Sequence, residues 1–167
     1  MLTNRQQSAC FTGHRKLSAD DLLRLPALLD DTLSALISRG FLHYHCGMAL
    51  GFDTLAAQAV LRARAQNPAV SLTAVLPCRE QDAPWSSGDQ ALYRELLAAA
   101  DKIIYTLDGP YTYDCMRIRN IRLVEYSSVC VAYMRRRRAR YSGTGQTVRI
   151  AQSQGLEVIN LAQSVGQ

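Results

Sequence analysis

The chain has 167 residues, of which 48% are hydrophobic and 20% charged, and its formal net charge is +5. This composition is typical of an ordinary globular domain, so we expect a single domain over residues 1–167. No run approaches the ~18 to 20 consecutive apolar residues of a transmembrane helix, which argues against a membrane protein.

Short apolar runs alternate along the chain with longer segments of helical period. Strands are predicted at residues 8–12, 41–46, 70–76, 102–107, 129–134 and 157–161, and helices at 18–39, 53–66, 88–100, 114–126 and 145–154. Charged residues are nearly absent from the strands, as expected when helices cover both faces of a parallel sheet. The pattern predicts an α/β fold, a Rossmann-like open and mainly parallel sheet of about six strands with helices on both faces.

The first predicted helix has leucines at three- and four-residue steps, which form one apolar face. Ser18, followed three positions later by Asp21, is typical of an N-terminal cap, and Gly40 is typical of a helix end. Pro26 allows two interpretations, because it either kinks this helix or begins a second one.

The loops that follow the strands are the expected place for a binding site, since ligands bind such sheets at the carboxyl ends of the strands. Thr12-Gly13-His14-Arg15 follows the first strand and brings an imidazole and a guanidinium to that edge. His14 alone fits a surface histidine equally well. His43 and His45 share a face of the second strand, but no third ligand is visible, so we expect no metal.

Two glycine-containing turns lead from a strand into a helix. In Cys46–Asp53 the glycines would let N–H groups approach an anion, and Asp53 suits the N-cap. Tyr141–Thr147 is the stronger phosphate-cradle signal, although it matches neither the P-loop nor the dinucleotide fingerprint. We expect the two turns to face one anion across a cleft, and valine at Gly51 or Gly145 to abolish binding without unfolding the protein.

The positive charge is concentrated in the last third of the chain. Residues 110–167 contain nine Lys and Arg against three Asp and Glu, whereas residues 1–109 contain ten against eleven. The densest basic stretch consists of Arg135, Arg136, Arg137, Arg138 and Arg140. Three interpretations stay open for this stretch: a mobile flap over a phosphate, a patch for single-stranded nucleic acid, or a solvated loop.

The motifs taken together resemble a known group. Cys10–Arg15, Gly47–Asp53, Pro77, Gln81, Trp85, Arg119-Asn120 and Gly143–Thr147 occur in the order seen in YpsA-like proteins of the SLOG superfamily, relatives of DprA and of the LOG phosphoribohydrolases. The resemblance implies a Rossmann-like fold with a pocket for nucleotide-derived ligands. The ligand-binding residues it implies are Thr12, Gly13, His14, Arg15, Gly47, Met48, Gly51, Asp53, Trp85, Arg119, Gly143, Thr144, Gly145 and Thr147.

Three functions follow from this resemblance. The first is the binding or sensing of a nucleotide or an ADP-ribose-like molecule, with no required cofactor and without catalysis. The second is a phosphoribohydrolase, but Arg149 stands where LOG enzymes carry their glutamate, and nothing in the spacing singles out Asp53 or Asp114 as a substitute. The third is single-stranded DNA binding of the DprA type, and partner recruitment through the arginine stretch fits all three. The resemblance also implies that a homo-oligomer is possible.

Five scattered cysteines, never in a CxxC pair, are typical of reduced thiols in the cytosol. The first residues run directly into the first predicted strand, which leaves no room for a secretory signal. We therefore expect a cytoplasmic protein.

Overall fold

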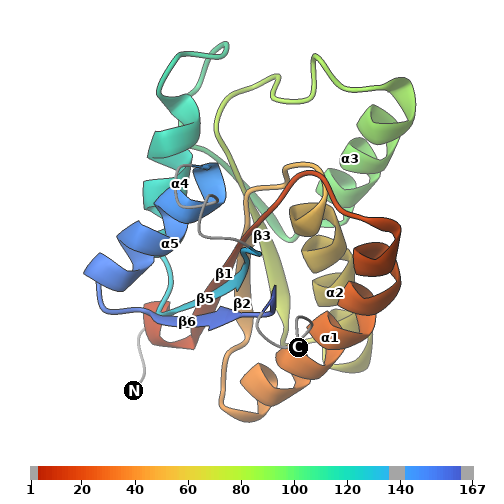
Figure 1. The fold of residues 1–167 in the computed structure, drawn as a ribbon, viewed down its shortest axis with the longest axis vertical. Helices are drawn as coiled ribbons and strands as arrows, with labels where there is room; N and C mark the ends of the chain where they lie inside the picture. The colour runs from red at the N-terminus through yellow and green to blue at the C-terminus, as the bar shows by residue number, and fades with distance from the viewer. Residues whose placement is uncertain (1–3, 136–141, 163–167) are drawn as a thin grey trace.

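The computed structural model describes residues 4–135 and 142–162. In this part of the chain six strands form one parallel sheet in the order β4-β3-β2-β1-β5-β6 (Figure 1). The strands are β1 Ser8–Gly13, β2 His43–Cys46, β3 Ser71–Leu76, β4 Lys102–Tyr105, β5 Val129–Tyr133 and β6 Glu157–Asn160. The helices are α1 Ala19–Ser38, α2 Phe52–Gln66, α3 Ser87–Ala99, α4 Cys115–Glu125 and α5 Gly143–Ser153, with a short 3-10 helix at Arg5–Gln7.

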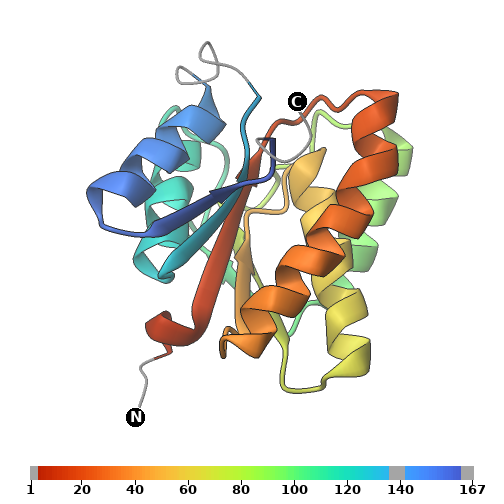
Figure 2. The ribbon, with the colours of Figure 1, turned by 60° about the horizontal axis from the view of Figure 1, so that its bottom comes forward.

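The helices lie in two layers. Helices α1, α2 and α3 cover one face of the sheet, and α4 and α5 cover the other (Figure 2). This arrangement confirms the predicted Rossmann-like α/β fold. The observed elements lie within a few residues of the predicted ones, and the 3-10 helix is the one described element that the hydrophobic pattern missed.

Helix α1 shows how local sequence and packing agree. Its leucine face is buried against the sheet, and Ser18 forms a complete capping box with Asp21: the Asp21 N–H donates to Ser18 Oγ and the Ser18 N–H to Asp21 Oδ2. Pro26 lies inside one continuous helix, so it does not begin a second one. The capping residues fix the start of α1 close to the ends of β1 and β5.

Aromatic side chains fill the core between the sheet and the α1–α3 layer. Phe11 stacks on Tyr44 at 6.0 Å and Phe52 stacks on Tyr133 at 5.9 Å between ring centroids. All five cysteines are buried free thiols, in keeping with a packing role. Among the described residues, no helix has the length and hydrophobicity needed to cross a bilayer.

The strand order reverses at β1. From β1 the chain proceeds through β2 and β3 to one edge, whereas from β5 it proceeds to β6 at the other. The loops that leave β1 and β5 therefore diverge, and in open α/β sheets such a switch point is the usual place for a ligand crevice.

Candidate functional site

A cleft of about 220 Å³ lies at this switch point. It is enclosed by the loop after β1, the beginning of α2, the first half of α4 and the beginning of α5. The residues that line it are Gly13, His14, Arg15, Ala49, Asp53, Met116, Arg119, Asn120, Ser142, Gly143 and Thr144. Seven of the predicted binding residues are therefore brought together at one place: Gly13, His14, Arg15, Asp53, Arg119, Gly143 and Thr144.

The beginning of α5 forms the wall of the cleft that is best suited to bind an anion. Ser142 is the N-cap, and its Oγ accepts the Gly145 N–H at 3.1 Å. Gly143 and Thr144 are the first two residues of the helix, where N–H groups have no intrahelical acceptor and the helix dipole is positive. Gly145 and Thr147 have a supporting role, since Thr147 Oγ1 donates to the Gly143 carbonyl at 3.0 Å.

The turn before α2 differs from the expected cradle. Gly51, with a φ of 78°, is the N-cap, and Asp53 is the second helical residue, so the expected N-cap at Asp53 is wrong. The Asp53 carboxylate turns back and accepts the Ala49 N–H through Oδ2 at 3.1 Å. The protein's own carboxylate thus occupies a donor that we expected an external anion to use.

Gly51 cannot be replaced as we expected. A Cβ at this position would lie 2.2 Å from the Arg15 carbonyl oxygen, and the positive φ is itself unfavourable for a larger residue. A valine here would disturb the turn and the loop after β1, so we no longer expect Gly51→Val to leave the fold intact. Met48 in the same turn also has a positive φ, 58°, which is uncommon for a residue other than glycine.

Arg119 reaches from α4 to the same turn and is only 5% exposed. Its Nη1 donates to the Gly47 carbonyl at 2.7 Å and its Nε donates to Asn120 Oδ1 at 2.9 Å. A Cβ at residue 47 would lie 2.4 Å from that Nη1, which explains the glycine. Gln81 Nε2 also donates to the Gly47 carbonyl, at 3.1 Å, so it supports the turn from the loop after β3.

The cleft combines an acid with these basic groups. Burial raises the pKa of Asp53 to about 6, against the opposing influence of Arg119, the Ala49 N–H and Arg15. Asp53 is therefore mostly ionised at neutral pH and gains a proton in mildly acidic solution. An anion in the cleft meets donors on the α5 side and a titratable carboxyl on the α2 side.

His14 is held at the cleft as a neutral imidazole. Its Nε2 accepts the Arg135 N–H at 3.0 Å, which assigns the ring proton to Nδ1. Burial, followed by the charge of Arg135, lowers the pKa of His14, although Asp21 opposes this. Arg135 is itself anchored, because its Nη1 donates to Asp21 Oδ2 at 3.2 Å, and Asp21 also accepts the Tyr133 hydroxyl.

The other predicted residues lie elsewhere. Trp85, Met48 and Gly51 line a separate pocket of about 240 Å³ between α2 and α3, where Trp85 packs edge-on against Tyr93 at 5.1 Å. Thr12 is buried within β1. The structure therefore does not bring Trp85 into the cleft. Arg136, Arg137, Arg138 and Arg140 lie outside the described residues.

Four cleft residues were not among the predicted ligand-binding residues: Ala49, Met116, Asn120 and Ser142. Asn120 could have been predicted, because it directly follows the predicted binding residue Arg119 in the Arg-Asn motif. Among the described residues, no group of three or more His, Cys, Asp or Glu is placed to hold a metal ion.

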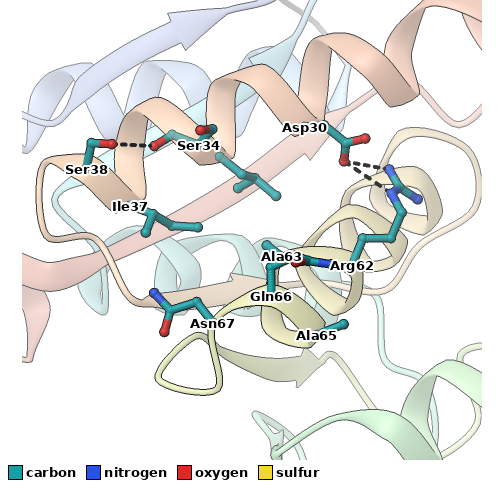
Figure 3. Close-up of a pocket in the computed structure, with 10 residues that line it drawn as sticks. Asp30, Ser34, Ile37, Ser38, Arg62, Ala63, Ala65, Gln66 and Asn67 are labelled. Carbon is teal, nitrogen blue, oxygen red and sulfur yellow. Dashed lines mark hydrogen bonds and ion pairs between the residues drawn. The ribbon is translucent and has the colours of Figure 1, made fainter.

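A larger pocket, of about 560 Å³, lies between the second halves of α1 and α2 (Figure 3). Asp30 and Arg62 form an exposed ion pair at 2.9 Å beside it, and Ile37 and Ala63 line its walls. It contains no predicted binding residue and no helix N-terminus. Its size alone does not make it the functional site.

Solved structures with the same fold include DprA from Streptococcus pneumoniae, with a TM-score of 0.65 and 17% identity over 93% of this chain and 50% of that chain. Another is DprA from Helicobacter pylori, whose structure addresses its mode of single-stranded DNA binding; its TM-score is 0.62, with 17% identity over 90% of this chain and 63% of that chain. These identities establish similarity of fold alone.

Among curated proteins, the UPF0398 protein BH1768 from Halalkalibacterium halodurans is 27% identical over 99 residues. The match covers 59% of this chain and 52% of that protein, so the chain spans about half of this relative's length. The YpsA family model, described as the YspA SLOG family, matches residues 13–140, and the chain belongs to this family.

Proposed function

We propose that this protein binds a nucleotide or a nucleotide-derived small molecule in the cleft at the switch point, and that it does so without catalysis. The observation that carries the proposal is the convergence of the α5 N-terminus with Arg15 on one small cleft. Family membership and the DprA-like fold support a ligand of the nucleotide or nucleic-acid class.

The available contacts are sufficient for moderate affinity. Hydrogen bonds to a charged group contribute about 1.5–3 kcal/mol each. Three such bonds, from the N–H groups of Gly143 and Thr144 and from the Arg15 guanidinium, would provide about 4.5–9 kcal/mol, which corresponds to dissociation constants of roughly 500 μM to 0.3 μM. Affinity in this range suits a sensor of a metabolite.

The test is a thermal-shift screen with mononucleotides, dinucleotides and ADP-ribose. A ligand at a hundred times its dissociation constant adds about 2.7 kcal/mol, and the Tm should rise by about 5–10 °C. The blocking variant is Gly143→Val, since among the described residues a Cβ at Gly143 meets no atom within 4 Å beyond its chain neighbours and its own helix backbone. It should fold normally and lose the shift, because the new side chain stands at the first turn of α5.

Gly88→Val is the matched control. Gly88 also lies in the first turn of a helix with a serine N-cap, and a Cβ there likewise meets nothing within 4 Å. Gly88→Val should keep the full ligand shift. The proposal fails if no nucleotide raises the Tm, or if Gly143→Val and Gly88→Val respond to the ligand alike.

A second candidate is single-stranded DNA binding, favoured by two exposed tyrosines in the loop before α4. Tyr113 is 98% exposed and Tyr111 is 62% exposed, and base stacking on aromatic side chains is a common feature of such binding. Oligonucleotide affinity that falls steeply with salt and is lost in Tyr111→Ala/Tyr113→Ala would favour this candidate. Nucleotide binding in the cleft should be much less sensitive to salt.

A phosphoribohydrolase has weaker support. Arg149, which occupies the position of the LOG glutamate, is exposed on α5 and does not line the cleft. Asp114 is also exposed, so Asp53 is the one carboxyl group among the described residues that lines the cleft. Release of a free base from nucleoside monophosphates, abolished in Asp53→Asn, would establish this activity instead.

A further inference from the structure

A second polar groove, of about 460 Å³, lies at the opposite end of the sheet from the cleft. It is formed where β1 to β4 begin, beside the C-terminal end of α4. Its lining residues are Asn4, Arg5, Ser8, His43, His45, Ser71, Thr73, Asp101, Lys102, Ile104, Glu125 and Tyr126. Strands of a parallel sheet are usually buried by apolar side chains on both faces, so a groove lined by this many polar strand residues is unusual.

The two histidines of β2 are oriented by serine hydroxyls. His43 Nδ1 lies 2.9 Å from Ser71 Oγ, and His45 Nδ1 lies 3.4 Å from Ser127 Oγ. Both rings line the groove, and since Nδ1 is engaged in each case, Nε2 is the ring nitrogen left for a ligand. In the tautomer in which the serine hydroxyl donates to Nδ1, the ring carries its proton on Nε2 and donates from there.

The groove is lined by two cations, Lys102 and Arg5, and by two acids, Asp101 and Glu125. Lys102 and Arg5 contribute cations, and the only described bond of the Arg5 guanidinium is from Nε to the Ser127 carbonyl, at 3.1 Å. The two carboxylates are already paired: Asp101 with Arg64 at 2.8 Å and Glu125 with Arg122 at 2.7 Å. The groove therefore presents donors and positive charge that its own acids do not neutralise.

The lowered pKa of His45 is consistent with the positive charge near it in the groove. Burial, followed by the nearby His43 and Lys102, lowers the pKa of His45 to about 4. The groups that face it from the neighbouring elements are His43, Lys102, Ser127 and Tyr126, whose ring centroid lies 5.6 Å away. A bound anion would offset the positive neighbours and raise this pKa.

We propose that this groove is a second anion site, which binds the phosphate group of a small molecule through Lys102, Arg5 and the Nε2 atoms of His43 and His45. A phosphate suits the groove because it offers several acceptor oxygens to donors that arrive from different strands. The groove shares no lining residue with the cleft. This proposal can therefore be tested separately from the nucleotide-binding function proposed above.

The experiment follows the histidine ring resonances by NMR during titration with inorganic phosphate and, separately, with AMP. We expect saturable shifts of His43 and His45 and a rise in the pKa of His45. Lys102→Met should weaken binding at least tenfold, because it removes a charged donor. Lys16→Met, which removes the chain's other lysine, is the matched control and should bind normally.

The Gly143→Val variant separates this groove from the cleft, and it should keep the histidine response. Equal affinity for phosphate and AMP would identify free phosphate as the ligand, and tighter binding of AMP would identify an organic phosphate. The proposal is overturned if chloride reproduces the shifts without saturation, if Lys16→Met weakens binding as much as Lys102→Met, or if the response follows self-association of the protein.

Discussion

The Arg119 guanidinium and the Gly47 carbonyl oxygen are joined by a 2.7 Å hydrogen bond in the space that a side chain at residue 47 would fill. This bond connects α4, on one face of the sheet, with the turn that leads into α2, on the other. The walls of the cleft are therefore held together by a buried guanidinium. A loss of this bond should affect both the stability of the fold and the shape of the cleft.

Arg119→Met should lower the free energy of unfolding by about 1–3 kcal/mol, because it reduces the buried hydrogen bonding of the Gly47 carbonyl. The Tm should fall by about 2–10 °C. Arg117→Met, which removes an exposed arginine from the same helix, is the control and should change the Tm by little. Equal effects of the two substitutions in thermal melts would contradict the role assigned to Arg119.

Gly51→Ala should be more destabilising than Gly155→Ala. Both glycines have a φ near 78°, which is unfavourable for alanine, and Gly51 also has a ψ of −117°, outside the left-handed helical region that other residues tolerate. Only the Cβ at residue 51 collides with main chain, 2.2 Å from the Arg15 carbonyl oxygen, whereas nothing lies within 4 Å of a Cβ at residue 155. Urea denaturation of the two variants measures the difference, and equal midpoints would show that the loop after β1 yields without cost.

Asp53 should make the protein less stable as pH rises through about 6. Its pKa is higher in the folded protein, about 6, than its ordinary value of 3.8, so the folded state binds the extra proton between these values. This contribution is complete below pH 4 and is lost on going to pH 7, a change of about 3 kcal/mol. Asp53→Asn should remove that part of the pH dependence, whereas Asp114→Asn, an exposed carboxylate of the same sheet edge, should retain it.

The affinity for a nucleotide should also depend on whether the Asp53 carboxyl group is protonated. A phosphate in the cleft is repelled by ionised Asp53, so wild-type affinity for a nucleotide should increase about tenfold between pH 7 and pH 5 relative to Asp53→Asn. The titration of the nucleotide's own phosphate affects the wild type and Asp53→Asn equally, so it does not contribute to the difference between the two proteins. Calorimetry across this range provides the measurement, and parallel pH profiles for the two proteins would place the bound anion away from Asp53.

The sequence predicted the sheet because each strand and helix leaves a local periodic pattern, and it predicted the α5 turn because Ser142 and Gly143 act on their own neighbours. Other features depend on residues distant along the chain. The burial of Arg119 goes with its bond to Gly47, which lies 72 residues earlier in the chain. Trp85 lines a pocket together with Met48 and Gly51, which also come much earlier in the chain. Local patterns contain no information on either contact.

The hydrogen bond from the Ala49 N–H to Asp53 means that one wall of the cleft is complete before any guest arrives. Because this wall is preorganised, a guest loses little affinity to the ordering of that turn. The specificity for one ligand over another then depends on the contacts that the ligand makes with the beginning of α5 and with the Asp53 carboxyl group. In a family member without this acid, the N–H group at the position of Ala49 would lack this acceptor until a ligand bound. Ligand binding would then be coupled to the ordering of the turn.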